Sequence, residues 1–330
     1  MASKKDDIIS ELVFLCLYVM ARFLSLIPFR MGQSMGRMLG RCLGAVLKGR
    51  IHASLNNLRS IFGDMLSEKE LLALNKRVVV HFAQMLFEVP HVFRMNRRNL
   101  DDYVVFENEQ VFHNAINQGR GVFVLTAHFG NWELMSAAIP LRFNVRGAVV
   151  VRPVDFKPAD RLLRIIRSRF GTDIIPKRRA MKHLLRAMRS NQAVGILLDQ
   201  NVDWYEGVFV SFLGRLACTN KGLALVAART GSPVIPTFSV RQPDGRYRVV
   251  FEPPVSLEKS GDKIRDMEEN TARFTQAIEK YVMTYPDHWF WFHRRWKTRP
   301  HCPLPPNFYS IDDAEDKTEA KYARYMGPLS

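Results

Sequence analysis

Short apolar runs rich in β-branched residues alternate with helical patterns through the middle of the chain. Strands are predicted at 121–127, 148–151, 193–198, 234–240 and 247–251, and helices at 132–139, 158–170, 179–189, 220–230 and 264–284. This alternation predicts an α/β fold, a sheet with helices on its faces. Ligands of such folds collect where strands end, so the residues that follow each predicted strand are the first candidates for a functional site.

A further helix is predicted ahead of this region. Ser67 and Glu70 have the spacing of a capping box. Apolar residues then recur on one helical face until Pro90 stops the pattern: Leu71, Leu74, Val78, Phe82, Met85, Leu86 and Val89.

The composition is that of a globular chain with a large positive charge. Of the 330 residues, 47% are hydrophobic and 24% charged, and 48 Lys and Arg against 32 Asp and Glu give a formal charge of +16. Such a surplus indicates an anionic partner, namely nucleic acid, a phosphorylated substrate or an anionic membrane face. The four cysteines are scattered without a CxxC pair, which argues against a disulfide scaffold and a structural zinc site.

The N-terminal segment 8–27 is mostly apolar and approaches the roughly 20 residues that cross a bilayer. Glu11, Tyr18, Arg22 and Ser25 share one helical stripe, so the predicted helix has one polar seam. Three interpretations stay open: a spanning anchor with its seam against protein, an interfacial helix, or a buried soluble helix. Basic residues that follow place the C-terminal bulk in the cytoplasm by the positive-inside rule: Arg30, Arg37, Arg41, Lys48 and Arg50.

The segment 121–135 carries the clearest chemical signal. His128 ends a predicted strand, residues 129–131 make a turn, and Glu133 begins a helix. We expect the Glu133 carboxylate to fold back and hydrogen-bond the imidazole, which would fix its tautomer and make it a general base. The alternative is an ordinary strand-end histidine followed by a glutamate that favours the helix dipole. No serine or cysteine completes a nucleophile motif here, so the reacting hydroxyl would belong to the substrate.

Cations dominate the segment from Arg161 to Arg189, in which Asp173 is the only acid, and Arg152 stands just before it at a strand end. Guanidinium groups bind phosphate in a bidentate way, so the segment predicts contact with a phosphorylated substrate, an anionic lipid or a carrier protein. Most of these side chains are also compatible with a solvated helix face.

Two later segments are ambiguous. Asp199 and Gln200 follow the strand at 193–198, where the acid either orients an arginine, accepts from a hydroxyl, or is an ordinary loop acid. Residues 207–219 read as a loop with an apolar tip, either a lip over an acyl chain or a hairpin in the core.

The segment 285–297, YPDHWFWFHRRWK, mixes tryptophans with basic residues. This mixture suits a membrane interface, stacking on single-stranded nucleic acid, or a C-terminal helix that packs tryptophans into the core. The polar stretch after His301 is predicted to be a tail.

Taken in order, these elements resemble the late acyltransferases of bacterial lipid A biosynthesis, the lauroyl/myristoyl acyltransferase family. The resemblance covers about residues 8–300 and rests on the N-terminal segment and on the motifs HFGNWE (128–133), VRP (151–153), RSRFG (167–171), LLDQN (197–201), FLG (212–214), GSPVIP (231–236) and WFHRRWK (291–297).

The resemblance implies a fold like that of the glycerol-3-phosphate acyltransferase superfamily, a mixed central sheet flanked by helices. It implies His128 and Glu133 as catalytic base and carboxylate. It also implies substrate-binding roles for Arg152, Arg167, Asp199 and Asn131, with no metal and no cofactor.

The implied reaction moves a fatty acyl group from acyl carrier protein, or from acyl-CoA, to a hydroxyl of a phosphorylated, Kdo-capped lipid A precursor. The expected location is the inner membrane, with the catalytic domain on the cytoplasmic face. The expected division is an anchor at 1–30, an acyltransferase domain at 31–300 and a tail at 301–330. Another lipid acceptor is the alternative: a lysophospholipid, an ornithine lipid or a mannosylated lipid. Nucleic-acid binding explains neither the apolar helix nor the His/Glu pair, so no nucleic-acid partner is expected.

Overall fold

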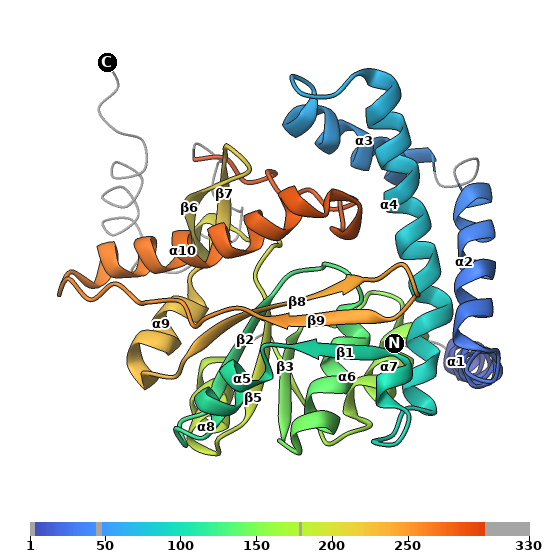
Figure 1. Cartoon of the computed structure of the whole chain (residues 1–330), viewed down its shortest axis with the longest axis horizontal. Coiled ribbons are helices and arrows are strands. Elements are labelled where there is room, and N and C mark those ends of the chain that lie inside the picture. The colour runs from blue at the N-terminus through green and yellow to red at the C-terminus, as the bar shows by residue number, and fades with distance from the viewer. Residues whose placement is uncertain (1–3, 44–47, 178–179, 301–330) are drawn as a thin grey trace.

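A seven-stranded sheet forms the centre of the protein in the computed structural model, which describes residues 4–43, 48–177 and 180–300 (Figure 1). The strand order is β1-β9-β8-β2-β5-β3-β4, and every pairing is parallel except β8 with β9. The strands are β1 (Val104–Glu107), β2 (Val122–Thr126), β3 (Gly147–Val151), β4 (Asp173–Pro176), β5 (Ala193–Leu197), β8 (Val234–Arg241) and β9 (Tyr247–Phe251). The predicted α/β fold with a mixed, largely parallel sheet is therefore confirmed.

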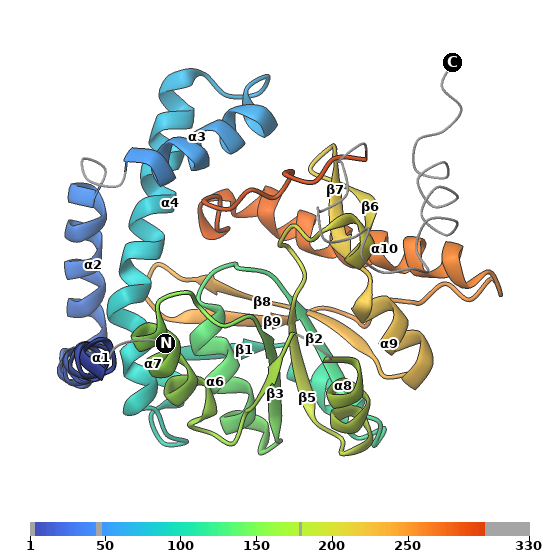
Figure 2. The same cartoon turned by 180° about the vertical axis from the view of Figure 1, so that it is seen from behind.

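Two apolar cores lie on the two faces of this sheet. Alternate residues of a strand point to opposite faces, and in β2 Phe123 and Leu125 join one core while Val122 and Val124 join the other. The first core includes residues of α4 (Glu68–Glu88), α8 (Ala180–Arg189), α9 (Gly222–Thr230) and α10 (Lys263–Thr284). The second includes residues of α5 (Glu109–Ile116), α6 (Trp132–Phe143) and α7 (Lys157–Ser168). Because helices cover both faces (Figure 2), β2 is buried along its whole length, as central parallel strands are.

The capping box predicted at Ser67 is present. The Ser67 backbone N–H donates to Glu70 Oε2 over 2.8 Å, and the Ser67 side chain accepts from the Glu70 N–H. Helix α4 runs from there to Glu88, and Pro90 falls in the short 3₁₀ turn Val89–Phe93 that follows. This long helix carries Glu88, a buried acid discussed below.

Helix α2 (Phe29–Leu43) lies alongside α4 in both views (Figures 1 and 2). Glycines make the close approach possible: a Cβ on Gly36 would lie 2.5 Å from Gln84 Cα, and one on Gly40 2.7 Å from Val80 Cα. Helix α3 (Lys48–Phe62) also packs against α4. The apolar and β-strand patterns did not predict α2, α3, α5, β1 or β4, of which β1 and β4 have only four residues each.

Helix α1 (Lys4–Leu24) sets its polar seam against the protein. Arg161 of α7 donates to Glu11, with Nη1 2.6 Å from Oε1, while Tyr18 and Arg22 contact the ring of Phe93 and Ser25 is buried. On the rest of the helix and the turn after it, apolar side chains are each more than half exposed: Ile8, Ile9, Leu12, Leu15, Val19, Met20, Phe23 and Leu26. The helix is therefore not a buried soluble helix. In the described part of the chain no helix is both long and apolar enough to cross a membrane, so the predicted spanning anchor lacks support.

The segment 207–219 folds as an antiparallel hairpin of β6 (Gly207–Phe212) and β7 (Arg215–Asn220). Phe212 and Ala217 lie in the first apolar core, so the hairpin interpretation is confirmed. The predicted tail at 301–330 lies outside the described residues, and the domain boundaries remain predictions.

Candidate active site

His128 stands at the carboxyl end of β2 on a turn that only glycine permits. Gly130 has φ +58°, and a Cβ there would lie 1.7 Å from the carbonyl oxygen of Ser239. The turn is further fixed by the backbone N–H of Asn131, which donates to Ser239 Oγ over 2.9 Å. Helix α6 begins at Trp132, as the sequence predicts.

The imidazole of His128 is held by Asp199, which follows β5. The ring Nδ1 lies 2.9 Å from Asp199 Oδ1, and the His128 backbone N–H donates to Oδ2 over 3.0 Å. Trp289 Nε1 donates to the same Oδ2 over 2.8 Å. Since the carboxylate accepts from Nδ1, the neutral ring carries its lone pair on Nε2, which is the arrangement of a general base.

Asp199 is only 1% exposed. Burial would raise the pKa of its carboxyl, but the charge and hydrogen bond of His128 and the neighbouring His293 bring that pKa well below its usual range. Asp199 is therefore an ionised carboxylate at neutral pH, able to stabilise an imidazolium on His128.

Glu133 does not make the predicted hydrogen bond with the His128 ring. Its carboxylate accepts from Arg167 of α7, over 2.8 Å at Nε and again at Nη2, and from Trp132 Nε1 over 3.1 Å. The reason is local geometry: α6 begins at Trp132, and the first turn of that helix directs Glu133 towards α7 instead of back to the strand end. The carboxylate that orients the imidazole comes from a neighbouring strand.

Arg167 and Glu133 form a largely buried ion pair, with side-chain exposures of 16% and 7%. Burial would lower the pKa of the Arg167 guanidinium, but the hydrogen bond and charge of Glu133 raise it. Arg167 is thus a fixed cation.

A cavity of about 930 Å³ opens at these side chains. His128, Glu133, Arg167 and Gln200 line it, together with Arg152, whose side chain is 78% exposed. Apolar groups line the remainder, from the sheet and from α6, α8 and α9: Val124, Met135, Ile139, Ala148, Val149, Leu184, Ile196 and Leu223. The lining therefore combines polar and charged side chains with apolar ones.

Asn131, predicted to bind substrate, lies in the interior and does not line this cavity. Its Oδ1 accepts from the Leu134 N–H over 3.0 Å, which caps α6, and its Nδ2 donates to Glu88 over 2.9 Å. Glu88 is fully buried and also accepts from Gln33, Arg241 and Tyr247. This network ties α2, α4 and the β8–β9 pair to the turn that carries His128.

The segment 285–297 is not an α-helix: a 3₁₀ turn at Pro286–His288 leads into irregular chain that lies beside the His128 turn. Gly130 N–H donates to the His288 carbonyl over 2.8 Å, and Phe290 N–H donates to the His128 carbonyl over 2.9 Å. Trp289, Trp291 and Trp296 are buried, so they are not free to lie at a membrane interface or to stack on nucleotide bases. Of the predicted roles, packing of the tryptophans into the core is the one that the structure shows.

A histidine held by an acid, beside cationic side chains and an apolar cavity lining, is a geometry that suits an enzyme for amphiphilic substrates. The chain belongs to the family of bacterial lipid A biosynthesis acyltransferases, which matches residues 3–298. It is accordingly an acyltransferase.

Individual relatives support this assignment at modest identity. The chain is 26% identical over 279 residues to a lipid A biosynthesis lauroyltransferase of Escherichia coli K12, covering 83% of this chain and 88% of the relative. It is 30% identical over 192 residues to a lipid A biosynthesis acyltransferase of Haemophilus influenzae, covering 57% and 60%. It is also 24% identical over 189 residues to a phosphatidylinositol mannoside acyltransferase of Mycolicibacterium smegmatis, covering 56% and 59%.

Proposed function

We propose that the protein transfers a fatty acyl chain from an acyl carrier protein thioester to a hydroxyl of a phosphorylated, Kdo-capped lipid A precursor. The observation that carries the proposal is the His128–Asp199 pair at the opening of a cavity of about 930 Å³ with an apolar interior. An apolar cavity suits an acyl chain, and the arginines at its opening suit phosphate.

In this mechanism His128 Nε2 takes the proton of the acceptor hydroxyl while its oxygen attacks the thioester carbonyl carbon. The carbon–sulfur bond then breaks, and the departing thiolate takes the proton from the imidazolium. The ester forms directly, without an acyl-enzyme. Asp199 keeps Nδ1 protonated and stabilises the imidazolium.

The remaining predicted residues divide between substrate contact and support. Arg152 and Arg167 are proposed to bind the acceptor's phosphates, since both line the cavity. Glu133 serves catalysis by holding the Arg167 guanidinium in place. Asn131 supports the His128 turn by capping α6.

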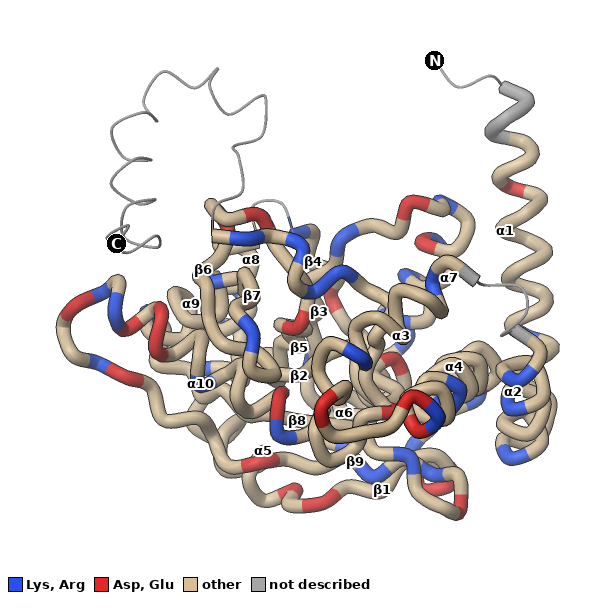
Figure 3. Tube along the Cα trace, turned by 90° about the horizontal axis from the view of Figure 1, so that it is seen from above, with Lys and Arg blue, Asp and Glu red and all other residues tan. Residues whose placement is uncertain are grey.

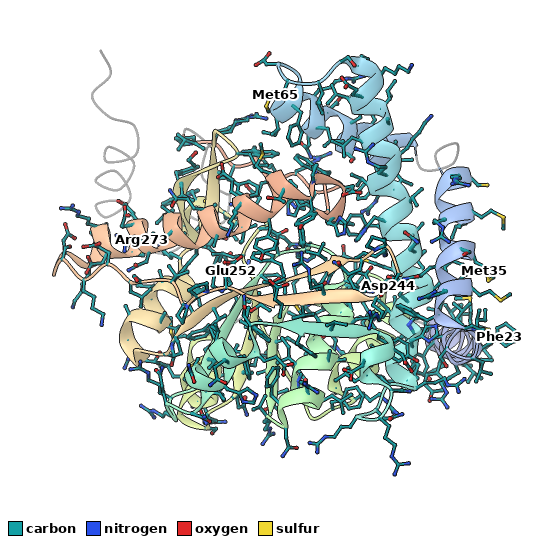
Figure 4. All side chains as sticks on the ribbon, viewed as in Figure 1. Phe23, Met35, Met65, Asp244, Glu252 and Arg273 are labelled. Carbon is teal, nitrogen blue, oxygen red and sulfur yellow. The ribbon has the colours of Figure 1, made fainter. Side chains whose placement is uncertain are left out.

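We further propose that α1 and α2 lie in the surface of the inner membrane, with the site on its cytoplasmic face. The apolar side chains of α1 continue on α2, where Met31 and Met38 are exposed beside the exposed Arg30, Arg37 and Arg41. Figure 3 shows the basic positions along α2, and Figure 4 shows Phe23 at the outer edge of α1. Apolar burial combined with attraction to anionic lipid is how interfacial helices bind.

Vesicle binding tests the membrane surface. Phe23→Ser should weaken binding to vesicles that contain anionic phospholipid, whereas Leu216→Ser, at another apolar residue that is more than half exposed, on β7, should not. Sedimentation measures both, and equal loss in the two variants would contradict the proposal.

A second acceptor class has one specific observation behind it. The similarity to a phosphatidylinositol mannoside acyltransferase favours a mannosylated lipid as the alternative acceptor.

Purified protein in mixed micelles separates these possibilities. Acyl carrier protein and acyl-CoA thioesters of several chain lengths are offered with each acceptor, and the products are identified by mass spectrometry. We expect transfer to the phosphorylated lipid A precursor from the carrier-protein thioester. Mass spectrometry of lipid A from a strain lacking the gene should show one missing acyl chain, and an unchanged lipid A would contradict the proposal.

A further inference from the structure

Gln200 is the side chain that faces the free nitrogen of the base. Its Nε2 lies 3.3 Å from His128 Nε2, and its side chain lines the cavity. Because His128 donates from Nδ1 to Asp199, its Nε2 is an acceptor, so the Gln200 carboxamide must present its N–H₂ group there. That nitrogen is where the acceptor hydroxyl must bind in the proposed reaction.

The backbone N–H groups of residues 128–131 are all used within the protein. The N–H of His128 donates to Asp199, that of Phe129 to the Ala127 carbonyl, that of Gly130 to the His288 carbonyl, and that of Asn131 to Ser239 Oγ. Turns of this kind often stabilise an oxyanion through backbone N–H groups, but these four are already used. Arg167, the nearby fixed cation, donates from Nε and Nη2 to Glu133 and is proposed above to bind the acceptor's phosphates.

The loop that carries Gln200 is braced from the C-terminal segment. Buried Arg295 donates from Nη1 to the Gln200 carbonyl over 3.1 Å. Asn201 and Thr298 exchange two hydrogen bonds, of 2.9 and 3.0 Å. These bonds fix the backbone that carries the exposed Gln200 side chain, so the carboxamide is attached at a defined position beside the base, as electrostatic stabilisation of a transition state requires.

We propose that the Gln200 carboxamide is a catalytic group that donates a hydrogen bond to the oxyanion of the tetrahedral intermediate. When the acceptor hydroxyl donates a hydrogen bond to His128 Nε2, it replaces the hydrogen bond from the Gln200 carboxamide to that nitrogen. The hydroxyl oxygen bonds to the thioester carbon, its proton passes to Nε2, and the carbonyl electron pair moves to the carbonyl oxygen. That oxygen is two bonds from the attacking oxygen, so the displaced N–H group lies beside it. Collapse restores the carbonyl and expels the thiolate, which takes the proton from His128.

This assignment rests on the proposed function, and the test uses the full-length protein in the same micelle assay with acyl carrier protein thioester and lipid A precursor. Gln200→Ala should lower kcat by about 10²–10³-fold with little change in the KM of either substrate, because the hydrogen bond forms only in the transition state. Gln200→Glu, equal in size but without an N–H donor, should lose at least as much. Gln110→Ala, at an exposed glutamine of α5, is the matched control and should keep the wild-type rate.

Each other outcome overturns the assignment. A Gln200→Glu or Gln200→Ala variant with near wild-type kcat removes the catalytic role. If Gln200→Ala raises KM at constant kcat, Gln200 only binds substrate in the ground state. If Gln200→Ala raises kcat, the Gln200 side chain blocks access of the hydroxyl to His128. If wild type is active, His128→Ala is inactive and Gln200→Ala is fully active, only this assignment fails. If His128→Ala matches wild type, the proposed function fails with it.

Discussion

Two buried carboxylates, Glu133 in the cavity lining and Asp199 behind His128, have different kinds of partner. Asp199 accepts from His128 and Trp289, whereas Glu133 accepts from Arg167 and Trp132. An imidazole gains and loses a proton near neutral pH, while a guanidinium never does. The comparison supports the proposed division, in which Asp199 serves proton transfer and Glu133 holds a permanent positive charge, although both acids follow an apolar strand in the sequence.

The largest expected effect belongs to the base itself. His128→Ala should lower kcat by about 10²–10⁴-fold because it removes the side chain that takes the proton of the hydroxyl in the proposed reaction. Initial rates of acyl transfer measure the loss, and circular dichroism confirms an intact fold. Transfer at the wild-type rate would show that His128 is not the base, and Asp199 would then have no role in proton transfer.

The second effect is on stability. Glu133→Gln should lower the free energy of unfolding by about 3–5 kcal/mol, because it leaves the Arg167 charge largely buried without its partner. Chemical denaturation measures this change. The double variant Glu133→Gln/Arg167→Met should recover much of it, and a single variant as stable as wild type would contradict the ion-pair role.

Asp199→Asn should lower kcat by about 10²-fold, at the lower end of the range for general-base catalysis. The amide no longer fixes the Nδ1–H tautomer or stabilises the imidazolium. Steady-state kinetics at pH 7 measure the loss. A larger loss of activity in Glu133→Gln than in Asp199→Asn, at equal folded fraction, would reverse the roles assigned to the two acids.

Trp289→Phe should have a smaller effect, about tenfold on kcat, since it removes one hydrogen bond to a charged group worth about 1.5–3 kcal/mol and keeps the aromatic packing. Trp291→Phe is the control, because its Nε1 donates to the Pro286 carbonyl and not to Asp199. Equal rates in the two variants would show that Trp289 does not support the carboxylate.

The smallest effect concerns acid stability. The pKa of Asp199 lies well below its usual value of 3.8 in the folded protein, so ionisation of Asp199 stabilises the fold above that value. This contribution to stability is fully present above pH 3.8. It is lost as the pH falls from 3.8 to below the pKa of Asp199 in the folded protein. Urea unfolding of wild type and Asp199→Asn from pH 7 to pH 3 should show a stability difference that shrinks only at the acidic end. A constant difference would contradict the pKa direction.

The sequence predicted the local parts of this site well. The apolar run before His128, the turn and the start of α6 follow from residue patterns within ten positions, as does the capping box at Ser67. Pairing of His128 with Asp199 joins residues 71 apart and depends on β2 lying next to β5. No local spacing predicts that neighbourhood, so the sequence analysis joined His128 to the nearest acid along the chain.

One signal for the correct pair was present. Thr126 pairs with Leu197 in the parallel register of β2 and β5, and His128 and Asp199 each follow two residues later. In neighbouring parallel strands, residues that follow a paired position by the same number of residues lie side by side. The burial of Asn131 had no such signal, because its partner Glu88 comes from the end of a distant helix.

The irregular segment after α10 has a consequence for how the protein is made. Residues that would touch substrate lie between 128 and 200, but the indole that grips the carboxylate and the arginine that braces the neighbouring loop arrive at positions 289 and 295. During synthesis the ribosome must release almost the entire domain before the reaction centre is complete. Premature termination upstream of Pro286 would therefore leave His128 and Asp199 in the chain but remove the Trp289 and Arg295 hydrogen bonds and three tryptophans of the first apolar core.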